Sequence, residues 1–246
     1  MANKETKVNA GTLYPYEVVE KASCFYGSSV ERNAINKYWD NLTDYFNNAS
    51  FNGLAIVDTS NSMTWGNNPR PIDVAISLGL YCAERAKGPF HNHYLSFSRA
   101  PKLIECKGID FVDKVQKIYR ANLCENTNLE AAFDFVLNTA IQNRLPQEDL
   151  PENLIVISDM EIDSMSTNGE PNMESLRKRW LRNGYKMPNL IYWNVNARND
   201  IILDKGPNVT YVSGCSPVIF EQIMTGKRGI EMMMDKLSGE RYSDIF

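Results

Sequence analysis

The stretch that most constrains this chain is a run of four apolar residues, 54–57, that ends abruptly in Asp58-Thr59-Ser60-Asn61-Ser62. A short apolar run bounded by turn residues is typical of a buried strand. In an open α/β sheet, ligands bind in the crevice beyond the carboxyl ends of the strands. The sequence therefore predicts a strand over 54–58 that delivers polar side chains to such a crevice.

Asp58, Ser60 and Ser62 offer one carboxylate and two hydroxyl groups at alternate positions. Magnesium prefers oxygen ligands in near-octahedral geometry and keeps several waters. The pattern Asp-x-Ser-x-Ser therefore fits a metal site. An ordinary turn is the alternative, because Asp, Ser and Asn side chains readily bond to nearby backbone groups.

Two other segments offer oxygen atoms to the same crevice. A second apolar strand is predicted over 153–158, and it also ends in an acid, Asp159. Thr127 stands just before a strongly amphipathic helix, where its hydroxyl could face the crevice. The alternative for Thr127 is structural, because Thr127 and Glu130 fit the Thr-x-x-Glu capping box.

Strands and helices alternate along the chain. We predict strands over 54–58, 94–98, 102–106, 153–158, 190–195 and 209–214. Helices are predicted over 72–86, 111–118, 129–141, 173–183, 218–224 and 230–237. This alternation indicates an α/β fold with a doubly wound, mainly parallel sheet of about six strands and helices on both faces. The strands at 54–58 and 153–158 are expected at its centre.

Residues 1–50 are predicted to form an N-terminal helical extension of the main domain, 51–246. Val18, Val19 and Ala22 indicate a first short helix. A second helix is expected to run from about Ile35 to Phe46, where apolar residues recur at spacings of three and four. About 50 residues bury too little surface to be stable alone, so the extension should pack on the main domain.

The composition excludes some classes of function. The chain has 246 residues and a net charge of −4, which argues against non-specific binding of nucleic acid. No apolar run is long enough to span a membrane, and the polar start of the chain does not look like a signal peptide. A cytoplasmic protein is therefore expected. The five cysteines include no closely spaced pair, so neither a zinc site nor a disulfide framework is indicated. We expect most of them to be buried thiols, and Cys82, Cys106 and Cys215 to be largely buried.

The order of these motifs resembles a von Willebrand factor A domain over residues 51–225. That family carries a metal-ion-dependent adhesion site, abbreviated MIDAS, built from Asp-x-Ser-x-Ser, a later Thr and a later Asp. The resemblance implies that magnesium or manganese binds at Asp58, Ser60, Ser62, Thr127 and Asp159. It also implies that the remaining coordination position takes an Asp or Glu carboxylate from a protein partner.

Three further stretches are similar to an uncharacterised family akin to the Ro (TROVE) RNA-binding proteins, which end in such a domain. These stretches are Ala55-Ile56-Val57-Asp58-Thr59-Ser60, Ile157-Ser158-Asp159-Met160-Glu161 and Ile191-Tyr192-Trp193-Asn194. Tyr14-Pro15-Tyr16 and Trp39 also resemble the lead-in to that family's domain. The resemblance implies association with RNA as an alternative function. The basic cluster of Arg177, Lys178, Arg179, Arg182 and Lys186 is the densest in the chain, and a solvated helix face is its other interpretation.

An enzyme of phosphoryl transfer is a third hypothesis. Haloacid-dehalogenase-type phosphatases need a second Asp two residues after the first, where this chain has Ser60. A Walker A loop is absent, and both histidines, His91 and His93, lie outside the predicted crevice. We therefore expect a non-enzymatic binding module.

Overall fold

The computed structural model describes most of the chain: residues 13–46, 52–66, 69–98, 100–121, 129–159, 173–197, 201–206, 208–216, 219, 234 and 237–238. Within these residues the strands are β1 (Gly53–Val57), β2 (His93–Ser96), β3 (Leu103–Glu105), β4 (Asn153–Ser158), β5 (Asn189–Asn194), β6 (Ile201–Gly206) and β7 (Val209–Ser213). The helices are α1 (Pro15–Ser23), α2 (Ser29–Asp40), α3 (Pro71–Arg85), α4 (Phe111–Arg120), α5 (Leu129–Asn143) and α6 (Met173–Arg182). Short 3-10 turns stand at η1 (Asn61–Thr64), η2 (Gly88–Phe90) and η3 (Gln147–Asp149).

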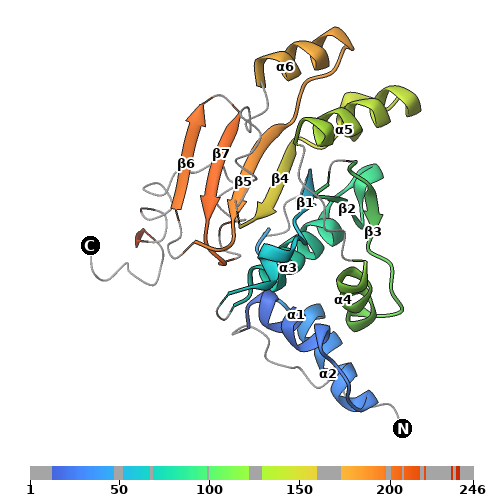
Figure 1. Cartoon of the computed structure of the whole chain (residues 1–246), viewed down its shortest axis with the longest axis vertical. Helices are drawn as coiled ribbons and strands as arrows, with labels where there is room; N and C mark the ends of the chain where they lie inside the picture. Colours follow the sequence, from blue (N-terminus) through green and yellow to red (C-terminus); the bar gives the residue numbers. More distant parts are fainter. Residues whose placement is uncertain are drawn as a thin grey trace.

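The seven strands form one sheet in the order β3-β2-β1-β4-β5-β7-β6 (Figure 1). The five strands from β2 to β7 run parallel, and β3 and β6 are antiparallel strands at the two edges. This arrangement confirms the predicted doubly wound sheet with β1 and β4 at its centre. The parallel centre brings the carboxyl ends of β1 and β4 to the same edge of the sheet.

Strand β6 was not predicted from the sequence. It forms an antiparallel hairpin with β7, and Asn208 takes a φ of +70° in the connection. A positive φ suits a tight turn, and Asn adopts it more readily than most residues. The predicted closing helices at 218–224 and 230–237 fall almost entirely outside the described residues.

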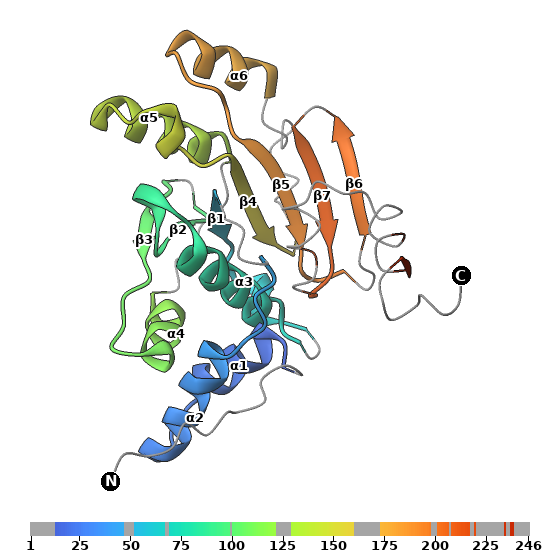
Figure 2. The ribbon, with the colours of Figure 1, turned by 180° about the vertical axis from the view of Figure 1, so that it is seen from behind.

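Side chains alternate between the two faces of the sheet and build two cores. Ala55 and Val57 of β1 pack on the side of α1, α3 and α4. Leu54 and Ile56 pack on the side of α5 and α6. Figures 1 and 2 show α3, α4 and the N-terminal helices gathered together, away from α5 and α6. Both faces of the parallel sheet are therefore covered, as its continuous apolar strands require.

Helix α3 lies unusually close to β1. A Cβ atom added to Gly79 would stand 2.4 Å from a methyl carbon of Val57. Glycine at this position therefore allows the helix backbone to approach the strand that carries Asp58. Nearly all residues of α3 are buried.

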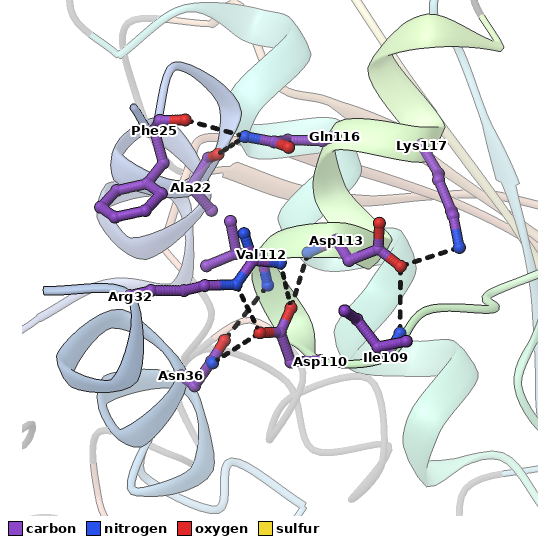
Figure 3. Close-up of polar contacts among 10 residues, drawn as sticks. All are labelled: Ala22, Phe25, Arg32, Asn36, Ile109, Asp110, Val112, Asp113, Gln116 and Lys117. Carbon is purple, nitrogen blue, oxygen red and sulfur yellow. Dashed lines mark hydrogen bonds and ion pairs between the residues drawn. The ribbon is translucent and has the colours of Figure 1, made fainter. Parts of the chain in front are cut away.

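The N-terminal helices α1 and α2 share a core with α3 and α4. Trp39 stacks on Phe111 with ring centroids 4.2 Å apart, and its indole N–H donates to Glu84 at 2.7 Å. Figure 3 shows the polar side of the same contact, where Arg32 and Asn36 of α2 meet Asp110 at the start of α4. The predicted boundary near residue 50 lies within 47–51, outside the described residues.

Helix α2 ends at Asp40, so the prediction that it continues to Phe46 was wrong. Local hydrogen bonds and a tertiary contact end it. The Asn41 side chain donates to the Lys37 carbonyl oxygen at 2.7 Å. The Tyr81 hydroxyl of α3 accepts from the Tyr45 backbone N–H at 2.8 Å and donates to the Thr43 carbonyl oxygen at 3.0 Å. Phe46 is still buried in the core, and its apolar character is what produced the helical pattern.

No helix within the described residues is long and apolar enough to cross a membrane.

Candidate metal centre

Parallel pairing of β1 and β4 builds the candidate site. Val57 lies opposite Ile157 in the register of the two strands. The Asp58 backbone N–H continues the ladder and donates to the Ile157 carbonyl oxygen at 3.0 Å. Asp58 therefore stands beside Ser158, one residue before Asp159, at the carboxyl edge of the sheet. The prediction that these two strand ends meet is confirmed.

The carboxylate of Asp58 is buried and is held at both oxygens. The Ser60 backbone N–H donates to Oδ1 at 2.8 Å, and the Ser158 hydroxyl donates to Oδ2 at 2.6 Å. Only 3% of Asp58 is exposed. Burial raises the pKa of Asp58 above its ordinary value, the bonds from Ser158 and Ser60 oppose this, and the negative charge of Asp159 adds to the increase.

The two serine hydroxyls of the motif lie next to each other. Ser60 Oγ and Ser62 Oγ are 3.1 Å apart. The turn η1, which begins just after Ser60, brings them together because it folds the chain back within three residues. Both hydroxyls therefore come from the loop that follows Asp58.

Met63 connects this loop to Asp159. Its side chain is fully buried, and its sulfur accepts the backbone N–H of Asp159 at 3.1 Å. This contact fixes η1 against the end of β4. Asp159 itself is 7% exposed, and its negative charge contributes to the raised pKa of Asp58.

The far end of the loop is held by a second polar cluster. Arg70, which precedes α3, donates from Nε and Nη2 to the buried carboxylate of Asp73 at 2.7 and 3.0 Å. The Tyr119 hydroxyl of α4 donates to the same carboxylate. The loop between Asp58 and α3 is therefore anchored at both ends.

The structure brings together four of the five predicted site residues. Asp58, Ser60 and Ser62 are joined by hydrogen bonds, and Asp159 stands beside them through Met63. Thr127 lies within 122–128, outside the described residues. The capping box that Thr127 and Glu130 would form is also not described, although the Glu130 carboxylate accepts from Arg179 at 2.7 Å.

Ser158 was missed by the sequence analysis. The signal for it was present in the alternation of side chains along a strand. Leu154 and Val156 point to the same face as Leu54 and Ile56, so Ser158 must lie on the face of Asp58. Recognising this contact required the register between the two strands, which the sequence alone does not contain.

The donor set suits a hard divalent cation. Among the described residues, no three His, Cys, Asp or Glu side chains form a cluster, so a metal here would depend on hydroxyl as well as carboxylate oxygens. Ligand oxygens at about 2.1 Å from an octahedral ion lie roughly 3 Å from each other. Ser60 Oγ and Ser62 Oγ share a hydrogen bond of 3.1 Å, and a separation of this size is also compatible with adjacent ligand positions of such an ion.

Two of the five residues of the basic cluster, Lys178 and Arg179, form ion pairs. Arg179 bonds to Glu130 and Asp134 of α5, and Lys178 bonds to Glu174 one turn earlier. These pairs favour the interpretation of α6 as a solvated face that also packs on α5. The histidines lie elsewhere, since His93 begins β2 at the opposite end of the sheet from Asp58.

The solved structure of the Ro (RSR) protein of Deinococcus radiodurans is similar to this chain, with a TM-score of 0.55 and 14% sequence identity. The match covers 88% of this chain and 45% of the Ro chain. At this identity the likeness concerns the fold alone, and it agrees with the predicted α/β fold with a doubly wound, mainly parallel sheet.

A curated relative is the "Uncharacterized protein L728" of Acanthamoeba polyphaga mimivirus, 27% identical over 240 residues. The alignment covers 95% of this chain and 41% of the viral protein, so the chain spans about two fifths of that relative. A family model described as "Domain of unknown function (DUF7788)" matches residues 52–243, which is most of the chain, and the protein therefore belongs to this family.

Proposed function

We propose that this protein is a non-enzymatic binding module whose MIDAS-type magnesium or manganese site captures an acidic residue of a protein partner. The ligands in this proposal are Asp58, Ser60, Ser62, Thr127 and Asp159. The observation that carries it is the pair of serine hydroxyls 3.1 Å apart beside a buried carboxylate. Such a spacing is expected for neighbouring ligands of an octahedral ion.

Charge supports the same proposal. Asp58 and Asp159 are both buried, and the charge of Asp159 opposes ionisation of Asp58. Two buried acids at one strand edge are costly unless a cation or hydrogen bonds compensate them. A bound divalent ion carries two positive charges, which the two carboxylates balance. It also has a coordination position that a third carboxylate can take.

The open coordination position of such an ion would allow it to bind an acidic residue of a partner. The loop 58–66 carries three of the proposed ligands, Asp58, Ser60 and Ser62, at the carboxyl edge of the sheet, and Trp65 of this loop is exposed. An Asp or Glu on a partner would complete the shell, whereas a neutral residue would not. Catalysis is not proposed, because the position that a phosphatase would give to its general acid is Ser60, whose hydroxyl contacts Ser62.

Association with RNA is the second candidate, by resemblance to Ro proteins. The basic residues of α6 do not favour it, since Arg179 and Lys178 are already paired with acids. RNA binding through free cations would weaken as salt rises. Retention of single-stranded RNA that falls with salt and is insensitive to EDTA would favour this candidate over metal-dependent capture.

Thermal unfolding in EDTA and in millimolar magnesium tests the metal site. The wild-type protein should unfold at a higher temperature with magnesium, because the ion binds the folded state. Asp58→Ala should lose this increase and unfold in EDTA no earlier than wild type, since it removes one of two repelling acids. Asp110→Asn is the matched control, because it neutralises an acid away from this edge and should keep the increase.

Partner capture is tested with the same variants as bait. A partner should be retained by wild type and Asp110→Asn in magnesium, and released by EDTA. Asp58→Ala should retain it in neither buffer. Equal melting temperatures of wild type in both buffers, together with equal partner binding, would contradict the proposal.

A further inference from the structure

Ser158 contacts the proposed metal site from the neighbouring strand. It is the last residue of β4, and its hydroxyl donates to Asp58 Oδ2 at 2.6 Å across one hundred residues of sequence. Ser158 is 1% exposed and Asp58 is 3% exposed, so water does not compete for this bond. A hydrogen bond to a carboxylate in such surroundings is short and strong.

With this bond, both carboxylate oxygens of Asp58 accept a hydrogen bond. Asp58 Oδ1 accepts from the Ser60 backbone N–H at 2.8 Å, within its own loop, while Oδ2 accepts from Ser158 on the other strand. Rotation of the carboxylate would break both bonds together. The Ser60 hydroxyl also bonds to this carboxylate. A carboxylate has about four acceptor positions, so these three bonds do not use its full capacity. The group is therefore held in one orientation and can still coordinate an ion or accept a hydrogen bond from its water.

We propose that Ser158 is a positioning residue that orients Asp58 for metal binding. This inference rests on the proposed function, and it adds a residue that is outside the five ligands. Ser158 acts through Asp58, since its hydroxyl proton is committed to Oδ2. Groups that orient metal ligands in this way typically raise metal affinity about 10- to 100-fold. Removal of the hydroxyl should therefore weaken magnesium binding more than it weakens the fold.

The chain offers a matched control in Ser77 of α3. Ser77 is also 1% exposed, and its hydroxyl donates to the Val74 carbonyl oxygen at 2.8 Å. Ser77→Ala thus removes a buried hydroxyl and its hydrogen bond to Val74, as Ser158→Ala removes a buried hydroxyl and its hydrogen bond to Asp58. The difference is the acceptor, which is a backbone carbonyl within one helix for Ser77 and a proposed ligand for Ser158.

The experiment titrates magnesium into wild type, Ser158→Ala, Ser158→Thr and Ser77→Ala by isothermal calorimetry, and it measures unfolding of each in EDTA. Ser158→Ala should raise the dissociation constant about 10- to 100-fold. Ser158→Thr keeps the hydroxyl and should restore binding toward the wild-type value. Ser77→Ala should bind magnesium as wild type does, even where its stability falls.

Ser158→Cys keeps the proposal testable if Ser158→Ala does not fold. The thiol is close to the hydroxyl in size but is a weak donor, so it should also weaken binding. Wild-type affinity in a folded Ala or Cys variant would overturn the role of Ser158 and leave the metal site standing. A folded Thr variant that fails to restore binding would also overturn it. Absence of binding to wild type would overturn both this inference and the proposed function.

Discussion

Arg32 of α2 donates two hydrogen bonds, of 2.7 and 2.8 Å, to the two carboxylate oxygens of Asp110, the residue that caps α4. Asn36 donates to the same carboxylate at 3.0 Å, and so does the Asp113 backbone N–H at 2.9 Å. The Arg32 bond is the largest cause that lowers the pKa of Asp110 to about 2. This cluster ties the N-terminal helices to the main domain by charge as well as by apolar packing.

The cluster predicts a pH dependence. The pKa of Asp110 falls from 3.8 to about 2 on folding, so its contribution to stability is fully present above the higher value. It is lost as pH falls through about 4 to about 2, as Asp110 takes up a proton in both states. In urea unfolding, the gap in stability between wild type and Asp110→Asn should therefore narrow over this range. A gap that stays constant down to pH about 2 would contradict the assignment.

Gly79→Ala tests the close approach of α3 to β1. An alanine normally stabilises a helix interior by about 0.5–1 kcal/mol relative to glycine. Here the added methyl would stand 2.4 Å from a Val57 methyl, so we expect a net loss of about 1–3 kcal/mol in urea unfolding. Val57→Ala in the same chain should recover part of that loss, because it removes the clashing methyl groups. A Gly79→Ala variant more stable than wild type would contradict the packing.

Thiol labelling of the native protein should follow burial. Cys24 is exposed and should react first, whereas Cys82 and Cys106 are buried and should react only after unfolding. Burial also raises the pKa of the Cys106 thiol to about 12, which removes the reactive thiolate near neutral pH. Mass spectrometry after brief labelling checks this order, with labelling in denaturant as the control. Labelling of Cys82 as fast as Cys24 would refute it. Cys215, predicted to be largely buried, is only half-buried.

The centre of the fold could be predicted because its strands are apolar throughout. The runs over 54–57 and 154–157 have no polar face, as strands covered on both sides must. Strand β6 was harder to predict, because only its first three residues are apolar and Asp204 and Lys205 follow them. The residues Gly206-Pro207-Asn208 that come next in the sequence are typical of a turn between two strands.

In the candidate site, too, the residues close in sequence could be predicted, whereas a contact between distant segments could not. Asp58, Ser60 and Ser62 could be predicted together, because five residues of one loop hold them. Asp159 followed from the rule that parallel strands end at one edge. Ser158 could not be identified, since its bond to Asp58 depends on the register of two strands one hundred residues apart. The end of α2 also depended on a distant residue, Tyr81 of α3.

The pairing of β1 with β4 has a consequence for synthesis on the ribosome. The elements from α1 to α4, residues 15–120, emerge first and contain most of the core on their side of the sheet. Asp58 is made early, but it stays without β4, one of the two neighbours of β1, until β4 has left the exit tunnel. Because contacts of such separation close late in folding, a nascent chain can bury α3 before it can assemble the carboxylate site. Competence to bind would then arise only in a chain completed past residue 159.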